Sequence, residues 1–87
     1  KILAAWNGLA LSALARAAVH PAACLADKRP FYLEVALRCA RFLERELLDP
    51  ATGGLLRVWR EGSAGIPAFA EDYACVIAGL LDLHQAA

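Results

Sequence analysis

The stretch Lys1-Ile2-Leu3-Ala4-Ala5-Trp6-Asn7-Gly8-Leu9 and its later counterpart Phe69-Ala70-Glu71-Asp72-Tyr73-Ala74 decide the fold of this chain. Each stretch places polar side chains where an apolar helical pattern begins. Two helices that are joined through one returning helix run in the same direction, so their N-terminal ends lie at the same end of a domain. The sequence therefore predicts that both stretches line one rim.

The residues around these stretches are unusually apolar. Hydrophobic residues make up 60% of the 87 positions, against roughly 45–50% in ordinary soluble domains. We expect a piece of a larger, helical protein. No uncharged run reaches the roughly 18–20 residues that a membrane-spanning helix needs, so no membrane partner is expected.

Charge and cysteine content exclude several classes of function. Nine basic residues balance nine acidic ones, so we expect neither a nucleic acid nor an anionic membrane as a partner. Cys24, Cys39 and Cys75 are an odd number without CxxC spacing, which predicts no disulfide framework, no metal site and a cytoplasmic location. We interpret Cys39 and Cys75 as small buried residues. No cofactor motif is present.

Apolar periodicity predicts three helices, at about 3–19, 30–48 and 72–86. The first and third are apolar on most sides, which is typical of buried helices. Pro21 ends the first, residues 21–29 form a connection, and Pro30 suits the first turn of the second. The second helix is amphipathic, and its outward face carries Glu34, Arg38, Arg41 and Arg45.

An insertion separates the second and third helices. Residues 49–54 are a turn signal, residues 55–60 suit a short extended piece, and residues 61–67 are interpreted as a loop. The order is therefore buried helix, amphipathic helix, hairpin-like insertion, buried helix. We predict an all-α fold, with residues 1–87 forming part of a single domain.

Several short motifs of this sequence resemble those of a known family. The chain resembles the YyaL-like, spermatogenesis-associated protein 20 family over essentially its whole length, through Trp6-Asn7-Gly8-Leu9, Tyr32-Leu33-Glu34, Gly54-x-Leu56, Glu71-Asp72-Tyr73-Ala74 and Gly79-Leu80-Leu81-Asp82-Leu83. It departs from the usual pattern at Ala10 and Ala70, where Met and Leu are common.

The resemblance implies a thioredoxin-like domain followed by an α/α toroid of the six-hairpin glycosidase type, related in fold to the N-acylglucosamine 2-epimerases. This chain would be a fragment of the toroid, three helices with a short hairpin-like insertion before the last. Its partners would be the remaining toroid helices and the thioredoxin-like domain of the parent chain.

A sugar site at the N-terminal ends of the inner helices is also implied by the resemblance. Independently, helix N-termini expose unpaired N–H groups and a partial positive charge. We expect Glu71 and Asp72 to act as catalytic acid or base, and a sugar ligand to contact Trp6, Asn7, Arg57, Trp59, Arg60 and Tyr73.

Each of these residues also has a structural interpretation. Asn7 and Asp72 are good N-cap residues, and Arg57 and Arg60 suit surface charges. Trp6 suits a core, and Tyr73 suits a buried position with its hydroxyl bonded to a neighbour. Adjacent carboxylates on a helix do not face each other across a substrate, so a second carboxylate would come from elsewhere in the protein.

The sequence therefore leads to two hypotheses of function. The first is a carbohydrate-active or carbohydrate-binding toroid segment, with epimerase-like, isomerase-like or glycosidase-like chemistry in the intact protein and none in this piece alone. The alternative is a non-catalytic helical scaffold attached to a thioredoxin-like domain. Exposure of the rim residues around a hollow favours the first, and their packing or capping favours the second.

Overall fold

The computed structural model describes the backbone of the chain and the side chains of residues 1–22 and 26–87. Cys24 lies outside the residues whose side chains are described. In chain order the elements are β1 (Ile2–Leu3), α1 (Ala4–Val19), the 3-10 helix η1 (Ala23–Lys28), α2 (Arg29–Glu46), β2 (Leu56–Arg60), β3 (Ser63–Pro67) and α3 (Ala70–Ala86).

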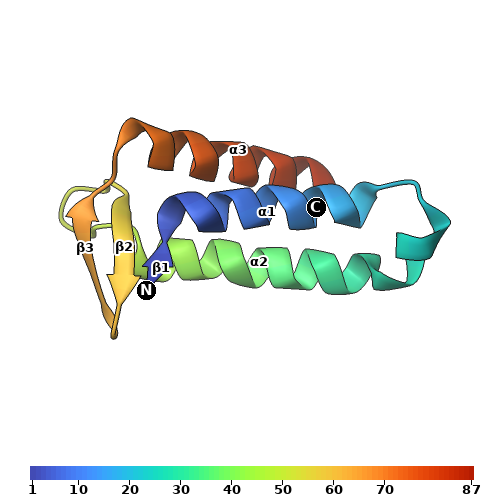
Figure 1. The fold of residues 1–87 in the computed structure, drawn as a ribbon, viewed down its shortest axis with the longest axis horizontal. Coiled ribbons are helices and arrows are strands. Elements are labelled where there is room, and N and C mark those ends of the chain that lie inside the picture. The colour runs from blue at the N-terminus through green and yellow to red at the C-terminus, as the bar shows by residue number, and fades with distance from the viewer.

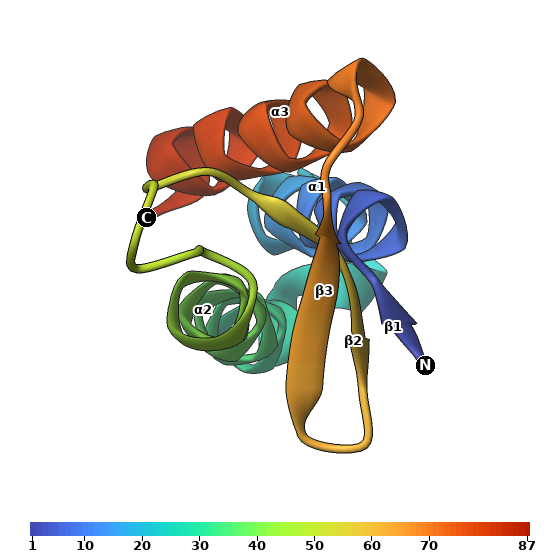
Figure 2. The same ribbon diagram turned by 90° about the vertical axis from the view of Figure 1, so that its left-hand side faces the viewer.

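The three long helices lie side by side, with α1 packed against both of the others (Figures 1 and 2). Helices α1 and α3 run in the same direction and α2 returns between them along the chain, as the sequence predicts. Helix α2 begins with a proline in its first turn, where the missing N–H has no helical partner to lose. Helix α3 begins at Ala70, two residues before the predicted start.

A small antiparallel sheet makes the all-α prediction incomplete. Its strand order is β1-β2-β3, and Ile2 pairs with Trp59 at its first edge. The interpretation of residues 61–67 as a loop is wrong, because Ser63–Pro67 pairs with β2. The tight turn between the strands uses positive φ at Glu61 and Gly62, 52° and 81°, which matches the right-handed twist of a hairpin.

Helices α1 and α3 approach each other unusually closely. The buried residues of each helix fall on one stripe, Ala4, Gly8, Leu11 and Ala15 on α1 and Asp72, Val76, Gly79 and Leu83 on α3. A Cβ atom added to Gly8 would lie 2.5 Å from the Cys75 carbonyl, and one added to Gly79 would lie 2.6 Å from the Gly8 oxygen. The two backbones are therefore in contact where these glycines cross.

The remaining core lies where α2 and the turn before β2 meet α1 and α3. Its buried apolar members are Ala36, Leu43, Leu47 and Leu55, together with the stripes on α1 and α3. None of the helices in the described part of the chain combines the length and the apolarity that a bilayer-spanning helix requires. An α/α toroid contains more helices than this chain holds, so the toroid stays a prediction.

The glycine crossing gives the first testable prediction. Gly8→Ala should lower the free energy of unfolding by about 1–3 kcal/mol, because the added methyl overpacks against backbone that cannot move aside. Replacing an ordinary helical glycine by alanine would instead raise the free energy of unfolding by roughly 0.5–1 kcal/mol. Urea unfolding of the native polypeptide measures the difference.

Gly65→Ala is the matched control, since an added Cβ there meets nothing within 4 Å. Its stability should stay close to that of the unchanged protein. A Gly8→Ala variant as stable as this control would contradict the close crossing.

Candidate functional site

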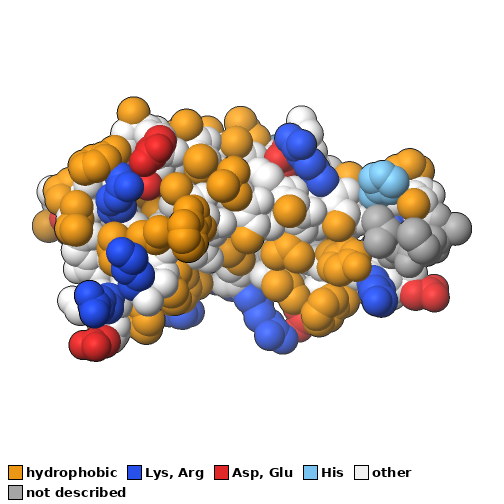
Figure 3. Space-filling model, in the orientation of Figure 1, with side chains coloured by type: hydrophobic (Ala, Val, Ile, Leu, Met, Phe, Trp, Pro, Cys, Tyr) orange, Lys and Arg blue, Asp and Glu red, His pale blue; other side chains and the backbone are white. Residues whose placement is uncertain are grey.

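The N-terminal ends of α1 and α3 and the sheet lie at one end of the molecule (Figure 1), so the predicted rim residues come from neighbouring elements. Acidic, basic and apolar side chains are mixed at this end (Figure 3). The structure brings three of the predicted residues into direct contact, Arg57, Glu71 and Asp72.

Asp72 is the most enclosed polar side chain of this group, with 1% of its surface exposed. Its Oδ2 accepts a hydrogen bond from the backbone N–H of Phe69 at 2.7 Å and another from Arg57 Nη1 at 3.2 Å. The Phe69 carbonyl in turn accepts from the Asp72 N–H. The expectation that Asp72 is the N-cap residue is wrong, because Phe69 holds that position. Asp72 instead caps α3 from its third residue, in the manner of the acidic half of a capping box.

Arg57 joins the sheet to α3. Besides Asp72, it contacts Glu71 Oε1 through Nη2 at 3.3 Å, and its guanidinium lies 4.4 Å from the centre of the Phe69 ring. A guanidinium over an aromatic face is attracted by the negative charge density of the ring. The interpretation of Arg57 as a simple surface charge is therefore wrong, because the side chain is held on three sides.

Asn7 lies inside α1, whose N-cap residue is Leu3. The expectation that Asn7 caps the helix is therefore wrong. Its Nδ2 donates to the Leu3 carbonyl at 3.0 Å, and its Oδ1 accepts from Cys39 Sγ at 3.4 Å, which ties α1 to α2. Cys39 and Cys75 are half-buried, so their interpretation as buried residues is only partly right. Partial burial raises the pKa of the Cys39 thiol, because a low-dielectric surrounding disfavours the thiolate.

Tyr73 and Trp59, two further predicted site residues, have partners within the fold. Tyr73 is 40% exposed, so its interpretation as a buried residue is wrong. Its hydroxyl accepts a hydrogen bond from the Leu55 N–H at 2.8 Å, a bond to a neighbour of the kind that the sequence predicts. Trp59 meets the Phe42 ring edge-on, with centroids 5.6 Å apart. Among the described residues the buried Trp59 Nε1 has no hydrogen-bond partner.

Trp6, Arg60 and Glu71 are exposed, as is Tyr73. Trp6 is 70% exposed, so its interpretation as a core residue is wrong for the described part of the chain. The Glu71 side chain is 68% exposed. Trp6, Arg60 and Glu71 are therefore accessible to a ligand.

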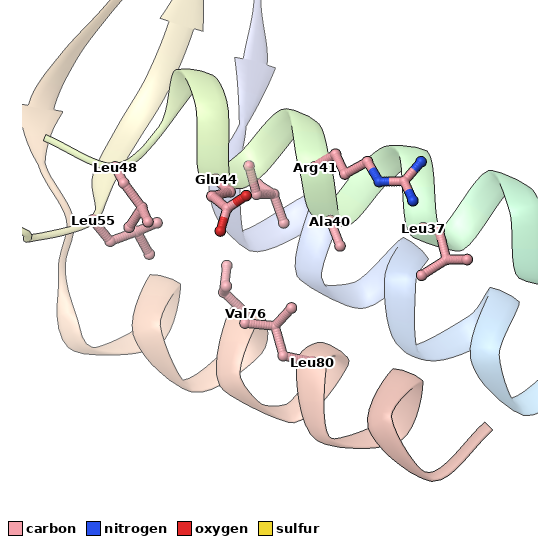
Figure 4. A pocket seen from close by; sticks show the side chains of 9 residues that line it. Leu37, Ala40, Arg41, Glu44, Leu48, Leu55, Val76 and Leu80 are labelled. Carbon is pink, nitrogen blue, oxygen red and sulfur yellow. The ribbon is translucent and has the colours of Figure 1, made fainter. Parts of the chain in front are cut away.

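Two hollows of the described structure lie mostly away from the predicted site residues. One of about 260 Å³ lies between α2 and α3 (Figure 4), and another of about 270 Å³ lies on the β-hairpin. Arg60 is the one predicted site residue that lines either of these two hollows. Sequence reasoning missed the hollow between the helices, although the apolar face of α2 was the signal that leads to it. Among the described residues, no three His, Cys, Asp or Glu side chains lie together in a way that could hold a metal ion.

The Asp72 contacts give a second prediction. Asp72→Ala should lower the free energy of unfolding by about 2–4 kcal/mol, because it removes a helix cap and the buried partner of Arg57. Glu71→Gln is the matched control, and the loss of its exposed pair should cost at most about 1 kcal/mol. Urea unfolding of both variants makes the comparison, and equal stabilities would contradict the capping role.

Comparison with known proteins places the whole chain against a short part of longer relatives. No family model and no solved structure matches the chain. It is 39% identical to spermatogenesis-associated protein 20 of Homo sapiens and of Mus musculus, over 99% of this chain and 11% of each relative. It is also 35% identical to an uncharacterized protein of Caenorhabditis elegans, over 97% of this chain and 12% of that protein.

The resemblance seen in the sequence words is confirmed to this extent, while the toroid and the thioredoxin-like domain stay predictions. The chain spans about 11% of the length of the curated relatives it matches. Over its whole length, this chain is similar to one segment of spermatogenesis-associated protein 20.

Proposed function

We propose that this chain is a helical scaffold segment that packs against the rest of a longer protein. The proposal rests on the hydrogen bonds of Asp72 and Asn7, the polar residues at the centre of the predicted rim. The polar side-chain atoms of both residues form hydrogen bonds that hold helix ends and neighbouring helices together. Asp72 in particular is closed to a substrate in this arrangement.

The outward surface supports the same function. Large apolar side chains are exposed along the long helices, among them Leu9 on α1, Phe31 on α2, and Ile77, Leu80 and Leu81 on α3. Apolar patches beyond a few hundred Å² are rare on monomeric soluble proteins and mark surfaces that contact another protein element. A scaffold segment inside a larger helical protein would bury these side chains.

The resemblance extends this proposal to a particular setting. In an α/α toroid of the six-hairpin glycosidase type, α1 and α3 would be parallel inner helices and α2 the outer helix between them. The remaining toroid helices would cover the exposed apolar faces, and a thioredoxin-like domain would lie in the same polypeptide. A cytoplasmic location fits the free thiols of Cys39 and Cys75.

Sugar binding at the rim is the second candidate, and the exposure of Trp6 favours it. An exposed indole offers a flat apolar face to a sugar ring. In this arrangement Glu71 is the carboxylate that a ligand can reach, and Asp72 acts by positioning Arg57. Epimerase-like or glycosidase-like chemistry would then need a further carboxylate from the rest of the longer protein.

A third prediction tests the scaffold. Ile77→Asp in the native polypeptide should lower its thermal midpoint strongly, because a scaffold position becomes buried against the rest of the protein and an unpaired charge there is costly. Ile77→Leu is the matched control and should cost less than about 1.5 kcal/mol. Differential scanning fluorimetry compares the two, and equal midpoints would show that this face of α3 stays in water.

A fourth prediction tests the sugar candidate. If the rim binds carbohydrate, ligand-observed NMR of the native polypeptide with a panel of monosaccharides and disaccharides should show binding that Trp6→Ala removes and Trp6→Phe partly retains. Circular dichroism establishes that both variants keep the fold. Absence of binding to every sugar, or binding unchanged in Trp6→Ala, would reject this candidate.

A further inference from the structure

We propose that the outer face of the sheet, which is the face that carries Val58 and Arg60, binds the phosphate group of a small organic phosphate. The inference rests on neither of the functions proposed above. Three features carry it: two neighbouring basic side chains without an acidic partner, a hollow beside them, and a glycine that the packing of this chain does not require.

The sheet has one covered face and one open face. Trp59 of β2 pairs with Ala64 of β3, and both pack against the core. Because successive residues of a strand point to opposite faces, Val58 and Arg60 lie on the other face. Figure 2 views the sheet along its edge and shows α2 on one side of the hairpin and no helix beside it on the other. The outer face is therefore open to a ligand.

Two basic residues lie next to each other on the outer face. The pairing of Ile2 with Trp59 places Lys1 opposite Arg60, one position beyond β1. On the other side of Arg60, its partner in β3 is Ser63. Opposed residues of paired strands have Cβ atoms about 4.5–5.5 Å apart on the same face. Figure 3 looks onto this face and shows basic side chains side by side over the sheet, with an acidic one at the tip of the hairpin.

The two cations have no acidic partner within the described part of the chain. Neither Lys1 nor Arg60 takes part in an ion pair there, and neither does Glu61 in the adjoining turn. Like charges at opposed positions of neighbouring strands repel each other and destabilise the pairing. An anion held between Lys1 and Arg60 would remove this repulsion.

The number of donors in this row favours a phosphate over a carboxylate. A phosphate monoester carries a charge of about −1.5 to −2 at neutral pH and has three strong acceptor oxygens. It therefore matches two cations and the hydroxyl of Ser63, whereas a carboxylate with its single charge matches one cation. The guanidinium of Arg60 can donate two parallel hydrogen bonds to phosphate oxygens.

A hollow of about 270 Å³ lies beside the row. Arg60 and Ser63 are polar members of its lining, and Val58 and Gly65 are apolar members. This volume is just below the roughly 300–1,000 Å³ of small-molecule sites, so it suits a phosphate with a short organic part. The organic part would lie over Val58 and Gly65.

Gly65 keeps this hollow open. A Cβ atom added to Gly65 would meet nothing within 4 Å, and the φ angle of Gly65 is not among the positive ones. Neither packing nor backbone conformation within this chain therefore requires a glycine at this position. A glycine inside a strand is typical of places where a ligand approaches the backbone closely.

Calorimetric titration of the native polypeptide at low ionic strength tests the proposal, because salt screens exposed charges. The probes are inorganic phosphate, glycerol 3-phosphate, glucose 6-phosphate and phenyl phosphate, with glycerol and glucose as uncharged counterparts. We expect at least one organic phosphate to bind more tightly than inorganic phosphate, and its uncharged counterpart to bind more weakly. Equal binding of inorganic and organic phosphates would overturn the role of the hollow.

Two substitutions with a matched control locate the site. Arg60→Gln should weaken binding about tenfold or more, because it removes hydrogen bonds from a charged donor. Arg41→Gln changes the net charge equally at an exposed residue of α2 that takes part in no ion pair of the described structure, and it should leave binding unchanged. Gly65→Val should weaken binding by filling the hollow, while a β-branched residue suits the strand.

Thermal unfolding without ligand separates a binding role from a structural one. Arg60→Gln should keep or raise the thermal midpoint, because it relieves the repulsion between two cations. A marked fall of the midpoint would show that Arg60 has a partner in the folded protein and would overturn the inference.

The remaining outcomes also decide the proposal. Absence of binding by every phosphate, or equal binding by Arg60→Gln and Arg41→Gln, would overturn it. Binding lost in Trp6→Ala but kept in Gly65→Val would assign the phosphate to the exposed indole of the sugar candidate and overturn it as well. Binding lost in Gly65→Val and kept in Trp6→Ala supports the site, and neither result depends on whether the chain is a scaffold.

Discussion

The close crossing of α1 and α3 is the constraint on which the rest of this structure depends. Because Gly8 and Gly79 carry no side chain, the two backbones touch, and the stripes on either side of the crossing interlock. The crossing fixes the two helices parallel and in register. It thereby brings both N-terminal ends to the sheet, where Arg57 can reach Glu71 and Asp72.

The contacts at the end of the molecule that holds the sheet stabilise the fold. Asp72 holds the first turn of α3, Arg57 joins it to β2, and Tyr73 fixes the turn before β2. Removing water from these groups makes each bond stronger and each broken bond more costly. Because these groups are bonded to one another, they are less available to a ligand. The sugar-binding hypothesis therefore depends on the exposed residues Trp6 and Glu71, and the scaffold hypothesis depends on the exposed apolar faces of the helices.

Much of this arrangement could be predicted from the sequence, because helical periodicity, together with Pro21 and Pro30, predicts three helices and their directions. The sheet could not be predicted in full: Ser63-Ala64-Gly65 has weak strand propensity and is held by its backbone pairing with β2. Proximity of Arg57 to Glu71 and Asp72 depends on long-range packing that no local pattern contains. The same holds for Asn7, whose contact with Cys39 lies across two helices.

The pairing of β1 with β2 also bears on the order in which the chain can fold. Ile2 meets Trp59, so this contact closes a loop that includes α1, η1 and α2. The β2–β3 hairpin closes over a two-residue turn, and closing a short loop costs less conformational entropy than closing a long one. The first residues of α1 thus gain their final neighbours late, and a chain still emerging from the ribosome must expose the start of α1 until β2 has been made.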